Sequence, residues 1–277
     1  MMFGRRERFE YWECSDCGCL SLVNVPENLR KYYPENYYSL RISRSNSLRR
    51  LRNRIYLSPL SFLVNWHRRS DLDAMRHARL TRKTRLLDVG CGAGYLIADL
   101  RELGYSAEGL DPFIAEDIRD HAGVRVHLKT LEQIMGSWDI ILFRHSLEHM
   151  PDQVNVLRTA RQRLREGGVC VVCIPVVGWA WRYYGTDWMQ LDAPRHLVIH
   201  TLKSLRLIAA KAGFVVDKVV FDSDELQFWA SELHRQDRVL TKNDRPGIVR
   251  RSVMRIRAWS LNRRGIGDKA QFYLRAV

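Results

Sequence analysis

The chain has 277 residues, a formal net charge of +14 and an apolar fraction of 46%. This length and composition suffice for one α/β domain with an appendage and a normal core. No apolar run is long enough to span a bilayer, and the N-terminus has no signal-peptide core, so we expect a cytoplasmic protein that is at most peripheral at a membrane. The charge favours an anionic partner such as nucleic acid, acidic lipid or a phosphorylated substrate.

Residues 1–40 are predicted to form a small separate module. Cys14 and Cys17 have the spacing of a zinc knuckle, and an aromatic run follows from Tyr32 to Tyr38. A structural zinc ion needs four ligands, and although Cys19 is a third candidate, no fourth is visible nearby. We therefore read the segment as a degenerate zinc ribbon, in which zinc or another divalent metal is possible but not favoured.

Residues 41–84 read as a basic helical linker. A helix is expected from Ser47 to Ser58, with Leu48 and Leu51 on its apolar side, and a second apolar piece runs from Leu60 to Trp66. A basic amphipathic helix can lie on an anionic membrane surface. The alternative, which we favour, is that the helix packs over the sheet or the substrate cleft with its arginines in water.

The most informative stretch runs from Arg85 to Tyr95. A buried strand, Arg85–Val89, is followed by a glycine turn and by a helix with apolar residues at helical spacing from Ala93 to Leu103. The next predicted strand, Ser106–Leu110, ends in Asp111, where a nucleotide-binding βαβ unit places the acid that binds ribose hydroxyls. The pattern predicts a nucleotide-type site at a helix N-terminus.

The turn resembles the first motif of the class I S-adenosylmethionine-dependent methyltransferases, D-x-G-C-G-x-G, at every fixed position from Asp88 to Gly94. The resemblance implies S-adenosyl-L-methionine as the cofactor. It also implies the cofactor-binding residues: Asp88, Gly90, Cys91, Gly92 and Gly94 for the methionine portion, Asp111 for the ribose, Thr130 and Leu131 beside the adenine, and His145 on the methionine side.

The remaining elements alternate between helix and strand. We expect a helix from Pro112 to His121, and strands at Val124–Leu128, Trp138–Phe143, Val169–Ile174, Phe214–Phe221 and Gly267–Arg275, with further helices after Asp152 and from Leu202 to Ala212. With the resemblance, this predicts a Rossmann-like α/β fold: a seven-stranded, mostly parallel sheet with its last strand antiparallel and helices on both faces. The domain would span 85–277, with an aromatic loop at 176–200 and a basic helical insertion at 223–264.

Methyl transfer from a sulfonium is an in-line displacement that needs a positioned acceptor and a group to take its proton. The candidates for that group are His149, His196 and Asp192, with His145 a further possibility. His145, Glu148 and His149 also fall at i, i+3 and i+4, similar to the E-x-x-E-H motif by which ubiquinone-biosynthesis O-methyltransferases bind a divalent ion. A histidine replaces the first acid here, so no metal ligand is assigned.

The aromatic loop suggests the acceptor. Its W-x-x-L-D-x-P-R-H pattern, from Trp188 to His196, and the N-terminal Y-Y-P-x-x-Y-Y run resemble a methyltransferase group that modifies sugars and surface polysaccharides. The resemblance implies O-methylation of a sugar or glycan hydroxyl in polysaccharide biosynthesis, with loop aromatics stacking on the acceptor, unless they simply plug the top of the sheet.

Three alternatives remain open. The protein could methylate another small molecule. It could methylate RNA, which is not favoured because no separate RNA-binding motif and no N-P-P-Y-type tetrad are seen. It could also be a non-catalytic protein that binds S-adenosylmethionine or a membrane surface.

Overall fold

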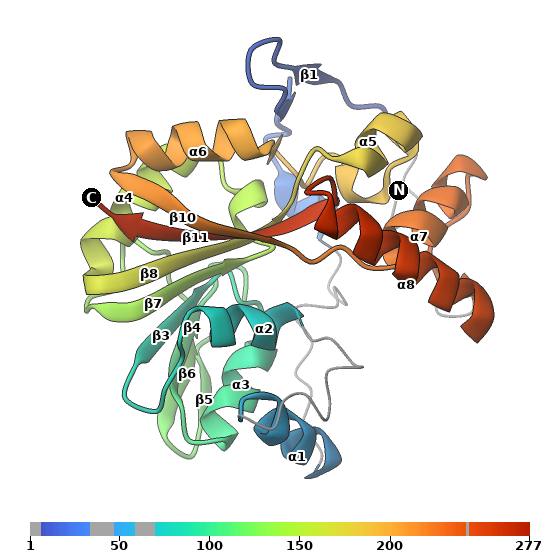
Figure 1. Ribbon diagram of the computed structural model, residues 1–277. Coiled ribbons are helices and arrows are strands. Elements are labelled where there is room, and N and C mark those ends of the chain that lie inside the picture. The colour runs from blue at the N-terminus through green and yellow to red at the C-terminus, as the bar shows by residue number, and fades with distance from the viewer. Residues whose placement is uncertain (1–6, 34–46, 59–69, 242–243) are drawn as a thin grey trace.

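The computed structural model describes residues 7–33, 47–58, 70–241 and 244–277, and its centre is an eight-stranded sheet (Figure 1). Along the sheet the order is β10-β11-β8-β7-β3-β4-β6-β5. The parallel strands are β3 (Arg85–Val89), β4 (Ser106–Leu110), β6 (Gly123–His127), β7 (Trp138–Arg144) and β8 (Leu164–Pro175). Strand β11 (Lys269–Ala276) is antiparallel to both of its neighbours, β8 and β10 (Phe214–Phe221). The predicted Rossmann-like architecture with an antiparallel last strand is confirmed.

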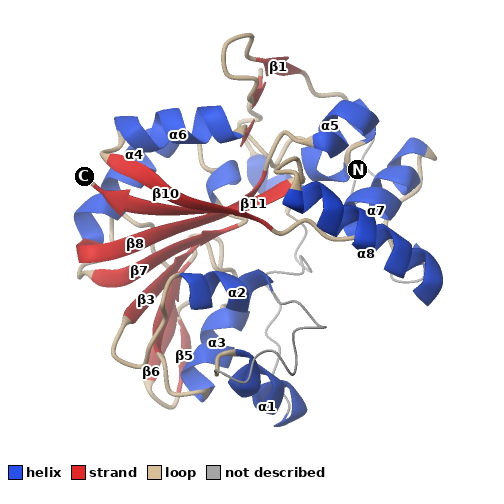
Figure 2. Ribbon diagram, viewed as in Figure 1, coloured by secondary structure: helices blue, strands red, loops and turns tan. Residues whose placement is uncertain are grey.

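Helices cover both faces of the sheet (Figure 2). One face packs on α4 (Gln153–Arg163) and α6 (Leu202–Lys211), and the other packs on α1 (Ser47–Tyr56), α2 (Ser70–His77) and α3 (Tyr95–Glu102). Leu87 belongs to the first core and Leu86 to the second, because successive side chains of a strand point to opposite faces. A strand buried on both faces reads as a continuous apolar run, which is why the sequence pattern located β3.

The predicted helix from Pro112 to His121 is wrong. The chain instead makes turns and then forms an eighth, edge strand, β5 (Ile118–Asp120), antiparallel to β6. Long-range contacts override the local helical pattern here. Asp120 pairs with Arg101 of α3 at 2.8 Å, and the side chain of Asp117 accepts a hydrogen bond from the backbone of Leu128.

The described part of the N-terminal segment is joined to the main domain, unlike the separate module that the sequence predicts. Strands β1 (Tyr11–Glu13) and β2 (Leu20–Leu22) form a hairpin, and β2 pairs with β9 (Val198–Ile199) in a three-stranded sheet. The pairing buries Leu20 in a cluster with Trp188. Residues 34–46 and 59–69, which include most of the aromatic run and the apolar piece after α1, lie outside the described residues.

Most of the aromatic loop packs inward. It contains α5 (Trp179–Tyr184) and two short 3₁₀ turns, at Gly185–Asp187 and Met189–Leu191, and a further 3₁₀ turn outside the loop, at Leu147–His149, follows β7. Trp188 is fully buried and its indole N–H donates to Asp268, and Tyr184 is buried too, whereas Tyr183 is exposed. Trp188 and Tyr184 therefore fill the top of the sheet, and their rings are too buried to stack on an acceptor.

The basic insertion contains α7 (Leu226–Arg235) and α8 (Ile248–Arg263). The start of β11, Lys269, lies opposite the end of β8, Pro175. The insertion therefore joins the sheet at the edge where the parallel strands end. In the described parts of the chain, no helix is both long and apolar enough to cross a membrane.

Candidate functional site

A glycine turn follows β3 at the carboxyl edge of the sheet. Gly90, Gly92 and Gly94 have φ values of 74°, 57° and 68°, in the left-handed region that favours glycine. A Cβ on Gly90 would lie 2.6 Å from the Cβ of Ser146, and one on Gly94 would lie 2.5 Å from a methyl group of Val126. The turn therefore needs glycine both for its conformation and for its close packing, and it leads into α3 as a ligand cradle requires.

Asp111, at the end of β4, holds this turn in place. One carboxylate oxygen accepts the N–H of Gly92 and the other accepts the N–H of Phe113, each at 2.8 Å. Burial raises the pKa of Asp111 above its usual range, although the two N–H donors oppose the rise. The carboxylate is thus oriented by backbone before any ligand arrives, as expected of a group that binds ribose hydroxyls.

Asp88 lies in β3, just before the glycine turn, and is buried. It is 1% exposed, and neither of its oxygens has a hydrogen-bond partner within the described part of the chain. The nearest cation is Arg144, whose Nε lies 4.0 Å from the carboxylate, and burial raises the pKa of Asp88 to about 7. A buried carboxylate without a hydrogen-bond partner calls for an explanation, and the role of Asp88 toward the methionine portion of the cofactor stays a prediction.

The other predicted cofactor positions lie around the same edge. Cys91 is buried, with its sulfur against Gly109, so only its backbone is available to a ligand at the turn. Thr130 and Leu131 follow β6. The end of this strand lies next to Asp111, because the N–H of Asp111 donates to the carbonyl of His127. The side chain of Leu131 is part of the hydrophobic core, and the N–H of Thr130 donates to Gln133. Their contact with adenine stays a prediction.

A second cluster lies at the end of β7. His145 has a left-handed φ of 52°, and the 3₁₀ turn that follows carries Glu148 and His149. The aromatic loop brings His196 against them, with ring centroids of His149 and His196 4.8 Å apart. His145 Nδ1 lies 3.5 Å, and His196 Nε2 4.0 Å, from one oxygen of the buried Glu148.

Hydrogen bonds assign the protons on the imidazoles of His149 and His196. His149 Nδ1 lies 2.8 Å from the carbonyl oxygen of Arg195, and His196 Nδ1 lies 2.7 Å from that of Gln190. Carbonyls only accept, so each Nδ1 carries the proton and each Nε2 keeps its lone pair. Burial lowers the pKa of both His149 and His196 to about 4, so both rings are neutral at neutral pH.

Carboxylates face these imidazoles. Burial alone would raise the pKa of Glu148, but the surrounding His145, His149 and His196 lower it to about 2. Asp192 lies 3.9 Å from His196 Nε2 and is ion-paired with the buried Arg195, while burial raises its pKa. The three predicted proton acceptors, His149, His196 and Asp192, are thus brought together, although they come from two distant segments.

The cluster also fits a divalent cation. Ligand atoms of Glu148, His149 and His196 lie within 4.8 Å of one another, and both Glu148 oxygens lack a hydrogen-bond partner among the described residues. In metal-binding imidazoles the N–H of the second ring nitrogen characteristically donates to a carbonyl or carboxylate, as the Nδ1–H groups of these two rings do. An ion bound there would lower the pKa of a coordinated hydroxyl. The N-terminal cysteines Cys14, Cys17 and Cys19 form the other such group in the described residues.

Tyr33 is a site residue that sequence reasoning did not assign. Its ring stacks on Phe113 with centroids 5.7 Å apart, and its hydroxyl lies 3.3 Å from His149 Nδ1. It therefore links the turn side of the site, through Phe113, to the histidine cluster. The aromatic run was visible in the sequence, but nothing local indicates which of its rings reaches the site.

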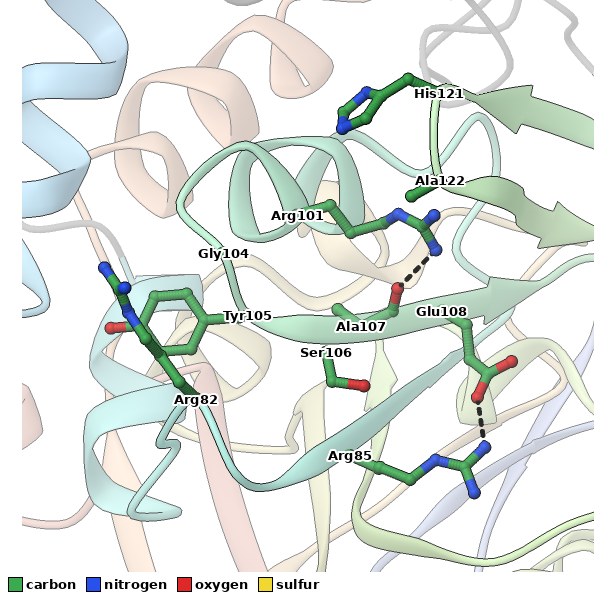
Figure 3. Close-up of a pocket in the computed structure, with 10 residues that line it drawn as sticks. All are labelled: Arg82, Arg85, Arg101, Gly104, Tyr105, Ser106, Ala107, Glu108, His121 and Ala122. Carbon is green, nitrogen blue, oxygen red and sulfur yellow. Dashed lines mark hydrogen bonds and ion pairs between the residues drawn. The ribbon is translucent and has the colours of Figure 1, made fainter.

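A cavity of about 420 Å³ lies at the opposite edge of the sheet (Figure 3). It is lined by residues near the starts of β3 and β4 and at the end of α3, including Arg82, Arg85 and Arg101. Arg85 pairs with Glu108 and Arg101 pairs with Asp120, so two of these arginines are already neutralised. Ligands of open α/β sheets bind at the carboxyl ends of the strands, and this cavity is at the other end.

A family model described as a methyltransferase domain matches residues 48–219, which is more than half of the chain. The ubiquinone biosynthesis O-methyltransferase of Azorhizobium caulinodans is 32% identical over 107 residues, which cover 35% of this chain and 42% of that protein. The protein of the same name from Bradyrhizobium diazoefficiens is 28% identical over 168 residues, which cover 50% and 66%. The matches thus span roughly half the length of these curated relatives.

Two solved structures are similar to this chain over about three quarters of its length. An S-adenosylmethionine-dependent methyltransferase from Mesorhizobium loti is 20% identical, with a TM-score of 0.47, covering 75% of this chain and 98% of that one. Another from Archaeoglobus fulgidus is 18% identical, with a TM-score of 0.47, covering 78% and 99%.

Proposed function

Because this chain belongs to the methyltransferase-domain family, with S-adenosylmethionine as its methyl donor, we propose that it methylates a hydroxyl oxygen of a small organic acceptor. The observation that carries the proposal is the pair of neutral imidazoles, the partly buried His149 and the buried His196, at the same sheet edge as the glycine turn. An oxygen nucleophile must lose a proton on methylation, and a neutral imidazole is a suitable acceptor for it.

The two halves of the site are directly connected. The hydroxyl of Ser146 donates to the carbonyl of Val89, at 2.6 Å, immediately before the glycine turn. Ser146 also sits against Gly90, and it precedes the 3₁₀ turn that carries Glu148 and His149. Donor and acceptor sides are therefore held in a fixed relation, which is the main requirement of an in-line displacement.

The proposed step balances as follows. The acceptor oxygen forms a bond to the methyl carbon while the bond from that carbon to the sulfonium sulfur breaks, and the sulfur keeps the electron pair as a neutral thioether. The hydroxyl proton passes to a Nε2 lone pair of His149 or His196. The imidazolium that forms is stabilised by the carboxylates of Glu148 and Asp192, which face His196 Nε2 at 4.0 and 3.9 Å.

The relatives support an oxygen acceptor, since their names describe O-methyltransferases. We propose as the finer assignment that the acceptor is a sugar or glycan hydroxyl. The support is the motif that ends in His196, whose polar members, the partly buried Asp192 and the buried Arg195, lie beside the histidine cluster. Trp188 of the same motif is buried against Asp268, so a sugar would be held by polar groups rather than by this ring.

The test uses methyl-labelled S-adenosylmethionine and fractionated cell extract, with His196→Ala as the matched variant. Label that enters an alkali-stable O-methyl product with the wild-type protein, and not with the variant, supports the proposal. Label in glycan or lipid-linked sugar supports the finer assignment, and label in another small molecule overturns only that assignment. Label in RNA or protein overturns the acceptor class, and cofactor binding with no labelled product supports the non-catalytic alternative.

A further inference from the structure

Helix α8 carries an apolar stripe on the side that faces away from the protein. Five large apolar residues with relative exposures between 48% and 80% recur at helical spacing: Ile248, Val249, Val253, Ile256 and Trp259. The opposite side of the helix, through Ala258 and Leu261, packs on Phe228 of α7. A surface helix normally buries its apolar face and exposes a polar one, so a second apolar face calls for a partner.

The charges beside the stripe identify the kind of partner. The helix has five arginines and no acidic residue. Arg251 and Arg255 are ion-paired with Glu225, and Arg257 lies over the ring of Trp179. Arg250 and Arg263 remain exposed beside the stripe, and Arg263 lies 4.9 Å from the centre of the Trp259 ring. An apolar stripe with a tryptophan, flanked by arginines, suits a surface that is apolar beneath an anionic layer.

We propose that the exposed face of α8 binds the surface of an anionic lipid membrane, with the stripe in the interfacial region and the arginines at the lipid phosphates. A second copy of this chain would bring a second helix with five arginines, which would repel the first. Nucleic acid would satisfy the arginines but would leave the five apolar side chains in water.

The position of α8 would place the candidate site near the membrane. The helix belongs to the insertion between β10 and β11, which enters at the carboxyl edge of the sheet, where the histidine cluster also lies. In Figure 1, α8 extends away from the sheet beside α7. Membrane binding through α8 would therefore bring the edge that carries the candidate site close to lipid-borne molecules. This inference does not depend on which acceptor is methylated.

The experiment measures cosedimentation of the full chain with vesicles of phosphatidylcholine alone and with vesicles that also contain phosphatidylglycerol. We expect binding to the anionic vesicles only, weakened by rising salt. The triple variant Val249→Ser/Val253→Ser/Ile256→Ser removes three exposed side chains and should lower the partition coefficient at least about tenfold. Folding is checked by S-adenosylmethionine binding, which this variant should retain.

Two matched controls locate the effect. The variant Met135→Ser/Leu207→Ser/Val215→Ser removes three exposed apolar side chains elsewhere and should bind vesicles as the wild type does. The variant Leu48→Ser/Leu51→Ser removes the exposed leucines of α1, and it should also bind normally. Loss of binding in the α1 variant rather than the α8 variant would overturn the proposal.

Three other results would overturn it as well. These are no binding to anionic vesicles, binding to RNA in place of vesicles, and a concentration-dependent dimer that the α8 triple variant abolishes.

Discussion

The imidazole rings of His149 and His196 lie with their centroids 4.8 Å apart, although one follows β7 and the other belongs to the aromatic loop. Each donates its Nδ1 proton to a backbone carbonyl, so both direct a lone pair from Nε2. The loop is held in this position by long-range bonds: the hydroxyl of Tyr11 donates to the carbonyl of His196, and the N–H of Leu197 donates to that of Glu148. The pair is therefore a product of the tertiary structure.

Replacing either imidazole should slow methyl transfer and leave cofactor binding intact. For His149→Ala and His196→Ala we expect kcat to fall about 10²- to 10⁴-fold, the usual contribution of a positioned proton acceptor. The S-adenosylmethionine dissociation constant, measured by calorimetry, should stay within about twofold, since neither ring lies on the glycine turn. His121→Ala is the control because His121 is exposed at the opposite edge. Full activity of both variants would refute the assignment.

The pH profile should extend further to the acid side than an ordinary histidine allows. Burial lowers the pKa of His149 and His196 to about 4, and only the neutral ring can accept a proton. Activity should therefore be retained as the pH falls through 6.5 and should decline only near pH 4, if the protein remains folded there. The measurement is kcat/KM against pH, with circular dichroism at each point. An acid limb centred near 6.5 would show that neither His149 nor His196 is the proton acceptor.

Asp111→Asn should weaken cofactor binding. The carboxylate accepts N–H bonds from Gly92 and Phe113 at once, whereas an amide would turn its own NH₂ group toward one of them. The same carboxylate is expected to accept the ribose hydroxyls, and losing one charge-assisted hydrogen bond to the cofactor costs about 1.5–3 kcal/mol, which corresponds to roughly ten- to hundredfold weaker binding of S-adenosylmethionine. Asp117→Asn, which alters a carboxylate that accepts the N–H of Leu128 beyond the turn, is the matched control. Equal affinities for the two variants would remove Asp111 from the cofactor site.

Removing divalent ions should leave activity unchanged if the imidazoles themselves take the proton. Glu148, His149 and His196 also fit a metal ion, so the measurement decides how their lone pairs are used. The assay compares kcat before and after dialysis against a chelator, with elemental analysis of the protein. Activity that disappears with the metal and returns with added zinc, manganese or magnesium would make the three groups ligands instead of proton acceptors.

The ring of Tyr33 should contribute to binding of the acceptor. It stacks on Phe113 and reaches His149, so Tyr33→Ala opens the space between the two sides of the site, whereas Tyr33→Phe keeps the stacked ring. We expect Tyr33→Ala to raise the acceptor KM about tenfold, as the loss of one aromatic contact suggests, and Tyr33→Phe to change it much less. Equal KM values for wild type and Tyr33→Ala would exclude a role for this ring in acceptor binding.

Sequence alone determined the parts of this protein that depend on neighbours along the chain. The turn from Asp88 to Gly94 was recognisable because left-handed glycines, a buried strand and a helix start must follow one another directly. The central parallel strands β3, β7 and β8 were located because burial on both faces leaves continuous apolar runs. The family model, which covers residues 48–219, confirms the methyltransferase fold that this reasoning predicted.

Only the tertiary structure decided the rest. The segment after Asp111 became strand β5 instead of a helix because Arg101 and the edge of β6 hold it. Trp188 is buried because its indole N–H has a hydrogen-bond partner, Asp268, inside the protein. Contacts between segments far apart in the chain bring Glu148 and His149 together with His196, and they place Tyr33 beside His149. Such contacts have no local signature, because their energy comes from burial and hydrogen bonds that exist only once the chain has folded.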